Sequence, residues 1–463
     1  MKRIDVLPDD VLLEVFGFCL DVSLPENQRQ RTWQTLVHVC RRWRSLVFGS
    51  SRRLDLRLVC THKTPTREAL DVWPAFPLIV SGNGMASSSG TDNVIAALEQ
   101  SNRICQVFLH ALQNWQMEEV SAAMQVSFPE LTTICLSSVL HGETPVIPDL
   151  FLGGSAPPLQ FLDLDGIPFL GLPKLLLSAD HLGCLSLSDI PHSGYISPEA
   201  IVALLCNLPS LCILSLGFRS PQSRPDWESR SLPPPKRSVL PILYEISFKG
   251  VTEYLEELVT RIDAPLLGEM DITFFNQIDF DCPRLAQFIN CTSALRARDE
   301  AHVEFGEFTA GVELGYRPSE FDFDFGDLLI KISCREPDWQ LSSIEQVCKT
   351  SLPLLSTVED LYIGYSRLVW KNDAIENTLW LELLLSFTSV KNLYLSKEFA
   401  PGIATALQEL VGGITEVLPS LQNIFVERLE PSGPFQKSIG QFVAARQLSG
   451  NPITVSVWDG NLI

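Results

Sequence analysis

The sequence predicts an α/β protein built as a repeat solenoid, preceded by a short helical domain. Three observations lead to this prediction. A strand-like apolar pattern returns along most of the chain, and amphipathic helical segments lie between its copies. The first fifty residues instead show helical apolar spacing. With 463 residues, 46% hydrophobic and 19% charged, the chain is long enough for one extended repeat structure or about three average domains.

The first predicted helix lies within residues 4–20, IDVLPDDVLLEVFGFCL. Pro8 suits a first helical turn because its missing N–H would have no partner there. Asp9 and Asp10 place negative charge near the positive end of the helix. The apolar residues at helical spacing are Val11, Leu12, Val15, Phe16 and Cys19. Leu13 and Phe18 lie outside this stripe and are available for a second contact.

A second helical region follows in residues 31–58. Its apolar residues at helical spacing are Trp33, Leu36, Val37, Cys40, Trp43, Leu46 and Val47. Two or three short helices of about 45 residues are generally too few to bury so much apolar surface by themselves. We therefore expect another surface to cover part of it.

The repeat is an apolar residue, two others, an apolar residue, one other, and an apolar residue. The copies end at Leu109, Leu136, Leu164, Leu187, Leu216, Phe248, Ile272, Ile332, Ile363, Leu395 and Val426, and residues 453–459 predict a final strand. Helices are predicted between them at 92–101, 198–208 and 403–414. The wide gap between Ile272 and Ile332 predicts two units.

These units resemble leucine-rich repeats, in which strand, turn and helix return every 20 to 30 residues or so. The resemblance implies a curved solenoid with a parallel sheet on the concave side and helices outside, because no unit buries its apolar face alone. One departure marks the repeats as irregular. The consensus Asn or Cys, three residues after the last leucine, is replaced by Val139, Ile167, Ile190, Arg219 and Val251.

The N-terminal region resembles the F-box. The match lies in Leu7-Pro8 followed by VLxxVF, then LxxVCRxW beginning at Leu36, at the front of leucine-rich repeats. The chain is thus similar to the F-box leucine-rich-repeat proteins abundant in fungi. In that family the F-box docks on the Skp-type adaptor of a cullin-based ubiquitin ligase, and the repeats hold the protein to be ubiquitinated. A longer polar connection, residues 19–32, departs from the compact motif.

The resemblance implies a set of adaptor-binding residues, carried over by position: Leu7, Pro8, Val11, Leu12, Val15, Phe16, Leu36, Val37, Cys40 and Trp43. For the last four, contact with the adaptor and packing between the helices remain two open alternatives. The expected partners are the Skp-type adaptor, through it a cullin, and an unidentified protein substrate. An interaction scaffold that binds the adaptor without directing ubiquitination is the alternative function.

The expected domain organisation has three parts. A helical F-box domain occupies residues 1–50, and a connecting region with the first repeat-like strands occupies 51–100. The irregular solenoid follows in 101–463, interrupted by a Pro-, Ser- and Arg-rich loop insertion at 217–238. A plain insertion is the simpler interpretation of this loop, with a phosphorylated regulatory loop as the alternative.

Composition and motifs argue against several function classes. Residues 81–463 carry a net charge of −23 and residues 1–80 carry +3, so nucleic acid is an unfavourable partner. The twelve cysteines form no C-x-x-C and are expected to be buried reduced thiols. No G-x-S-x-G or H-E-x-x-H motif occurs. We expect no catalytic site, metal or cofactor, no membrane-spanning segment, and a cytoplasmic or nuclear location.

The outward positions of the strands are the expected substrate face. One such row is predicted to contain Phe108, Cys135, Asp163, Ser186, Ser215, Ser247, Asp271, Lys331, Tyr362, Tyr394 and Phe425. Its last three residues, Tyr362, Tyr394 and Phe425, are candidates for target recognition because aromatic side chains are enriched in binding hot spots. Aromatic residues also simply favour strands. A small-molecule co-ligand on this face is a further alternative, disfavoured because only Lys249 and Lys331 supply cations there.

Overall fold

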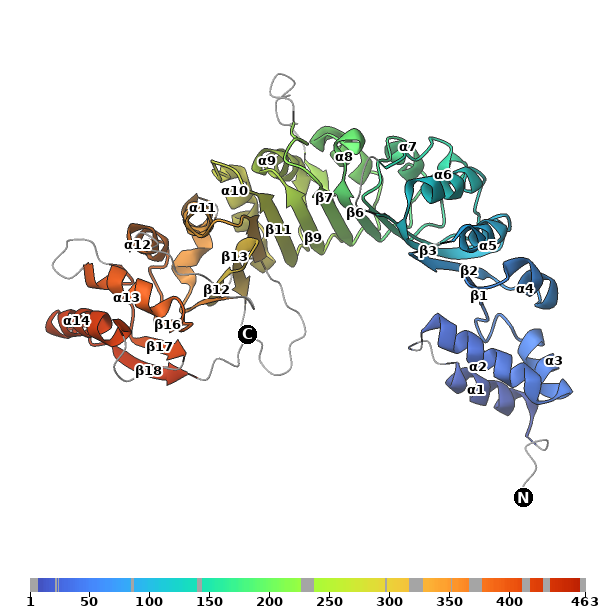
Figure 1. Ribbon diagram of the computed structural model, residues 1–463, viewed down its shortest axis with the longest axis horizontal. Coiled ribbons are helices and arrows are strands. Elements are labelled where there is room, and N and C mark those ends of the chain that lie inside the picture. The colour runs from blue at the N-terminus through green and yellow to red at the C-terminus, as the bar shows by residue number, and fades with distance from the viewer. Residues whose placement is uncertain are drawn as a thin grey trace. The chain divides into compact units, whose positions relative to one another are not determined.

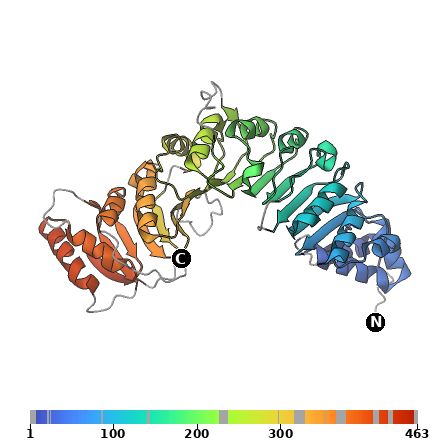
Figure 2. The ribbon, with the colours of Figure 1, turned by 45° about the horizontal axis from the view of Figure 1, so that its top comes forward.

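The computed structural model describes residues 7–20, 23, 25–84, 87–139, 144–225, 237–295, 298–315, 328–350, 352–365, 377–409, 417–427 and 434–458. The chain forms two compact units, residues 1–196 and 197–463. Each is an α/β repeat structure of leucine-rich-repeat type, as the sequence predicts, with helices along one side of a mostly parallel sheet (Figures 1 and 2).

The first unit begins with a helical head, followed by six strands. The head consists of α1 (Asp9–Cys19), α2 (Glu26–Val39) and α3 (Arg41–Gly49). The strands are β1 (Leu58–Thr61), β2 (Leu78–Asn83), β3 (Ile104–Leu112), β4 (Thr133–Ser138), β5 (Phe161–Asp165) and β6 (Cys184–Ile190). Between them lie α4 (Thr66–Val72), α5 (Ser88–Leu98), α6 (Asn114–Ala123) and α7 (Leu172–Leu176). The strands pair in parallel in chain order.

The second unit continues the pattern of strand and helix. Its strands are β7 (Ile213–Phe218), β9 (Glu245–Gly250), β11 (Glu269–Phe275), β12 (Glu300–Phe305), β13 (Thr309–Gly315), β14 (Leu328–Ser333), β15 (Asp360–Tyr365), β16 (Asn392–Leu395), β17 (Asn423–Glu427) and β18 (Thr454–Trp458). Its helices are α8 (Pro198–Leu205), α9 (Thr252–Arg261), α10 (Pro283–Cys291), α11 (Pro337–Thr350), α12 (Asn377–Leu385), α13 (Ala400–Glu409) and α14 (Pro434–Leu448). A two-residue pair, β8 (Ser238–Val239) and β10 (Ile262–Asp263), lies outside the main sheet.

Every predicted repeat copy lies on a strand. The repeat leucines alternate with less buried residues along each strand, as in β5 and β9, so the core sits between the sheet and the helices. Local signals place the helices. Ser197 accepts a hydrogen bond from the Ala200 N–H (3.3 Å) just before Pro198, which opens α8. Of the predicted loop 217–238, residues 226–236 lie outside the described residues.

The gap between Ile272 and Ile332 holds an antiparallel insertion. The strand order in the second unit is β7-β9-β11-β14-β13-β12-β15-β16-β17-β18. β14 pairs in parallel with β11, β12 pairs in parallel with β15, and β13 runs antiparallel to both of its neighbours. A tight connection after β12, in which the Gly306 N–H donates to the Thr309 carbonyl (2.7 Å), turns the chain back. The gap is therefore not filled by two ordinary parallel repeats.

Candidate partner-binding surfaces

Helix α1 has two apolar faces, and only one of them is covered by this chain. Leu12, Leu13 and Phe16 are buried, whereas Val11 and Val15 are 43% and 44% exposed and Phe18 is 82% exposed. Because successive residues in a helix turn by about 100°, Val11, Val15 and Phe18 share one side and Leu12 and Phe16 lie about a third of a turn away. We call the exposed set, completed by Leu7 and Pro8 at the start of the helix, the α1 stripe.

The buried face of α1 packs inside the head. The Phe16 ring meets the Trp43 ring of α3 edge to face, with centroids 4.8 Å apart. Two surface contacts fix the start of the helix: the Arg42 guanidinium lies 2.6 Å from an Asp9 carboxylate oxygen and donates to the Leu7 carbonyl (2.6 Å). These contacts hold the helix in place while its other face stays open.

The structure thus divides the predicted adaptor-binding residues into three groups. Leu7, Pro8, Val11 and Val15 are exposed, Leu12, Phe16, Leu36 and Val37 are buried in this chain, and Cys40 and Trp43 are half-buried. The burial of Leu36 and Val37 corresponds to the second of their two alternatives, packing between the helices rather than contact with the adaptor. The adaptor set predicted from the sequence does not include Phe18 or the 56% exposed Val39, although the sequence places Phe18 apart from the other apolar residues, where it is available for a second contact.

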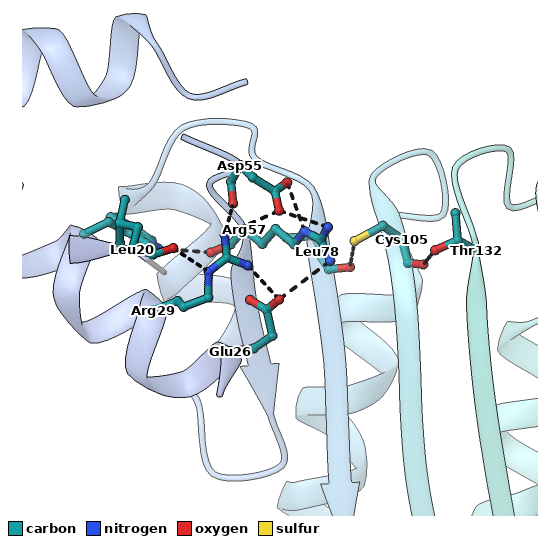
Figure 3. Close-up of polar contacts among 9 residues, drawn as sticks. Leu20, Glu26, Arg29, Asp55, Arg57, Leu78, Cys105 and Thr132 are labelled. Atoms are coloured by element: carbon teal, nitrogen blue, oxygen red, sulfur yellow. Dashed lines mark hydrogen bonds and ion pairs between the residues drawn. The ribbon is translucent and has the colours of Figure 1, made fainter. Parts of the chain in front are cut away.

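A buried arginine ties the head to the first repeat. The Arg29 side chain in α2 donates through Nε to the Leu20 carbonyl (3.3 Å) and through its terminal nitrogens to Glu26 (3.0 Å) and Asp55 (3.4 Å). Arg57, just before β1, lies 3.1 Å from the Asp55 carboxylate and 3.7 Å from that of Glu26 (Figure 3). The resulting cluster joins α2 to the chain entering the sheet.

Aromatic packing closes the same junction. The Trp33 ring of α2 lies edge to face with Trp73 (5.0 Å between centroids) and Phe76 (5.5 Å), and its Nε1–H donates to the Arg57 carbonyl (3.2 Å). Trp33 is buried against residues that precede β2. The head is therefore part of the first compact unit and not an independent domain.

The predicted target-binding aromatics form one stack on the outward side of the sheet. Tyr362, Tyr394 and Phe425 are in register on β15, β16 and β17. The Tyr362 and Tyr394 ring centroids are 4.2 Å apart, those of Tyr394 and Phe425 are 4.6 Å apart, and the rings of both pairs are nearly parallel. His302 of β12 stacks on Tyr362 at 4.5 Å. We call these four residues the aromatic ladder. His302 was missed because its strand does not carry the repeat pattern.

Exposure differs along the ladder. Tyr362 is only 4% exposed, whereas Tyr394 and Phe425 are half-buried. Trp458 of β18 leans across the stack, with its ring centroid 6.0 Å from Tyr362 and 5.5 Å from Tyr394, and its Nε1–H donates to the Leu395 carbonyl (3.4 Å). Tyr362 therefore supports the stack from within, and the accessible part of the ladder is toward Phe425.

A polar ladder runs beside the aromatic one, two residues earlier on each strand. Thr454 donates to Asn423 (2.5 Å), Asn423 donates to Asn392 (2.8 Å), and Asn392 donates to the Asp360 carboxylate (2.5 Å). All three side chains donate in the same direction along this ladder, toward its charged member Asp360, which is 8% exposed. Such a charge-assisted series stabilises the buried carboxylate and fixes the spacing of the strands.

The predicted outward row is correct within each unit except at Lys331. Phe108, Cys135, Asp163 and Ser186 pair in register in the first unit, and Ser215, Ser247 and Asp271 do so in the second. Lys331, however, pairs with Thr273, and Leu329 is the residue opposite Asp271. The row then passes through Glu313 and His302 to Tyr362. The inserted strands β12 and β13 cause the difference, because the repeat pattern does not reveal them.

The cysteines are free thiols, not disulfides; five of them are buried and three, Cys19, Cys206 and Cys291, are exposed. Burial raises the pKa of Cys135 to about 12 and those of Cys60 and Cys105 to about 11, so these thiols are neutral at physiological pH. Within the described residues, no three His, Cys, Asp or Glu side chains are grouped as a metal site, and no helix is long and apolar enough to cross a membrane.

Comparisons with known proteins assign no family to the chain. No family model matches the chain, and no curated protein matches it. Among solved structures, the leucine-rich repeat-containing protein LegL7 from Legionella pneumophila is similar at 13% identity and a TM-score of 0.29, over 86% of this chain and 99% of that one. A chain of the Rad7 and Elc1 complex in yeast is similar at 12% identity and a TM-score of 0.25. The match covers 91% of this chain and 88% of that one. The leucine-rich-repeat assignment therefore rests on the repeats and strands of this chain itself.

Proposed function

We propose that this chain is a substrate-recognition subunit of a Skp–cullin–F-box ubiquitin ligase. The α1 stripe docks on the Skp-type adaptor, and the outward face of the repeats binds the protein to be ubiquitinated. The observation that carries the proposal is the α1 stripe itself. Val11, Val15 and Phe18 are exposed on a helix whose other apolar face is covered by this chain, and Val11 and Val15 are positions where the sequence resembles an F-box.

The energetics favour a protein partner for this stripe. Fully burying a valine or phenylalanine side chain contributes about 1.5–3 kcal/mol. Val11, Val15 and Phe18 lie together on one helix, so a single groove or helix face on a partner covers all three. Covering them removes from water a contiguous apolar strip that the chain itself leaves open.

In this proposal the chain does no bond-making chemistry. It holds its target near a ubiquitin-charged enzyme, which raises their effective concentration to about the millimolar range for a flexible tether. The Arg29 cluster and the Trp33 packing fix the head against the first repeat, so the connection at that point is rigid. A fixed geometry restricts which target lysines come within reach.

Coexpression with a Skp-type adaptor tests the proposal. Val11→Asp combined with Val15→Asp should reduce copurification of the adaptor by about a hundredfold, because two carboxylates would lose water on docking without gaining partners. Phe18→Ser alone should weaken it less. Val146→Asp is the matched control, since Val146 has a similar exposure (46%) and lies outside the head. Circular dichroism checks that each variant remains folded.

Undiminished adaptor capture by the folded double variant would contradict the docking role of α1. The alternative function, a scaffold that binds the adaptor without directing ubiquitination, is separated by reconstitution. Adding the adaptor, cullin and charged ubiquitin-conjugating enzyme should yield ubiquitinated target if the chain is a ligase subunit. Adaptor binding with no transfer to any bound protein would favour the scaffold.

A further inference from the structure

The aromatic ladder stops one strand before the edge of the sheet. Its ring spacings of 4.2–4.6 Å follow the separation of neighbouring strands, so each strand contributes one ring to the stack. Phe425 pairs across the ladder with Ser456 of β18. Since the Phe425 ring is nearly parallel to that of Tyr394, its second face is directed toward the position above Ser456. Among the described residues, the group at that position is the exposed hydroxymethyl group of Ser456, and no fifth ring of theirs is stacked there.

The outward side of the sheet in the second unit is predominantly negative, and Glu427 is its carboxylate nearest in the pairing to Phe425 and Ser456. The outward positions of the main-sheet strands that the structure describes in the second unit carry eight carboxylates: Glu245, Glu269, Asp271, Glu300, Glu304, Glu313, Asp360 and Glu427. Only two lysines share that side, Lys249 and Lys331, and Lys331 lies 3.7 Å from Asp271. Glu427 comes two residues after Phe425 on the same strand and pairs with Trp458. A field of this sign attracts a cation and disfavours an acidic ligand.

A buried polar atom lies in the same region. Ser396 directly follows the last residue of β16 and is 8% exposed, yet its hydroxyl has no hydrogen-bond partner among the described residues. Trp458 donates to the carbonyl of the preceding residue, Leu395. In the part of the chain that the structure describes, the end of the ladder thus combines an open stacking position above Ser456 with the neighbouring carboxylate of Glu427.

We propose that an arginine side chain of the target stacks on Phe425 above Ser456 and becomes the fifth member of the aromatic ladder. The inference rests on the proposed function, because it assigns the kind of segment that the repeat face takes: an exposed, arginine-containing stretch of the substrate. A guanidinium is planar, weakly hydrated and permanently charged, so it matches both the flat ring and the acidic surroundings. A lysine ammonium matches only the charge.

Peptide binding to the full chain tests the inference without the adaptor. The probe is a fluorescein-labelled Gly/Ser peptide with three spaced arginines, followed by anisotropy. Citrulline and lysine versions are the matched probes, because citrulline keeps the planar shape without the charge and lysine keeps the charge without the plane. We expect the arginine peptide to bind about tenfold more tightly than either.

Two substitutions at one exposed site make the experiment specific. Ser456→Tyr fills the vacant position with a ring from the chain itself and should weaken arginine-peptide binding about tenfold. Ser456→Thr leaves the position open and should bind as the unaltered chain does. Equal affinity for all three peptides, or full binding by a folded Ser456→Tyr chain, would overturn the proposal.

Failure here is distinguishable from failure of the proposed function. The peptide is measured on the isolated chain, whereas adaptor docking is measured by copurification and depends on α1. A chain that captures the adaptor and supports ubiquitination but ignores the arginine peptide would refute only the stacking site. A chain that binds the peptide through Phe425 but no adaptor would refute only the ligase role.

Discussion

Arg29 is the residue on which the junction between the head and the repeats most depends. It is 6% exposed as a side chain, and its guanidinium contacts a backbone carbonyl and two carboxylates from three different segments. Burial of an arginine is costly unless such partners satisfy it, so removal of the side chain affects all of them together.

Arg29→Met keeps much of the apolar stem and removes the charge. We expect the free energy of unfolding to fall by about 1–3 kcal/mol, because the Leu20 carbonyl loses its donor and two carboxylates lose their counter-charge. Urea denaturation measures the change. Arg67→Met is the control, since Arg67 and Glu99 form a long, exposed ion pair (3.8 Å) that should contribute little. Equal effects of the two substitutions would show that the Arg29 cluster is not a structural junction.

At the residue scale, the sequence predicts which residues of α1 are apolar but not which are covered. Val11, Leu12, Val15 and Phe16 fall within one broad stripe by spacing alone. The structure divides them because α3 packs against the side that carries Phe16. That division depends on the helix–helix arrangement, which no local pattern contains. The same holds for Arg29, whose partner Asp55 is 26 residues away.

At the scale of elements, the polar ladder stabilises the C-terminal strands by side-chain hydrogen bonds that all run the same way, from Thr454 through Asn423 and Asn392 to Asp360. Asn392 is its pivot, because it donates to Asp360 and accepts from Asn423. Replacement of an amide by a carboxylate therefore has different consequences at neighbouring rungs.

Asn392→Asp would place a carboxylate beside that of Asp360, at the position of a 2.5 Å contact. We expect the free energy of unfolding at pH 7 to be about 1–3 kcal/mol lower than that of the unaltered chain. Mutual repulsion raises the pKa of the pair in the folded state, so the loss is present above that pKa and shrinks as the pH falls toward 4. Asn423→Asp is the control: its neighbours Asn392 and Thr454 are neutral, so no second carboxylate lies beside the new one and both its loss at pH 7 and its pH dependence should be smaller. Urea denaturation at pH 7 and 4.5 distinguishes the two.

Strands that carry the repeated apolar pattern can be predicted from the sequence, whereas the inserted strands β12 and β13, which lack it, cannot. The strands that contain Leu109 to Val426 follow from the apolar spacing, and the in-register row of Tyr362, Tyr394 and Phe425 follows from equal positions in successive repeats. β12 and β13 were missed because their pairing is decided by a turn and by contact with β14 and β15. That omission displaced Lys331 in the predicted row and hid His302.

At the scale of the whole molecule, the two proposed surfaces belong to different units. The α1 stripe lies in the first, and the aromatic ladder lies in the second. They share no residue, and the first is apolar whereas the second is surrounded by acidic positions. Binding at one surface therefore has no evident differential contact that would alter affinity at the other.

We expect the two binding events to be independent and ubiquitination to require both. The arginine peptide should bind the isolated chain and its adaptor complex with affinities that agree within about twofold. The Val11→Asp, Val15→Asp chain should keep peptide binding, and the Ser456→Tyr chain should keep adaptor binding.

In a reconstituted ligase with a lysine-containing reporter fused to the arginine peptide, either variant should lose most transfer, because tethering supplies the effective concentration only when both contacts exist. Free arginine peptide should inhibit the unaltered chain by competition at the repeats. Loss of peptide affinity in the α1 variant, or of adaptor affinity in the Ser456 variant, would contradict independence and indicate that the two units communicate.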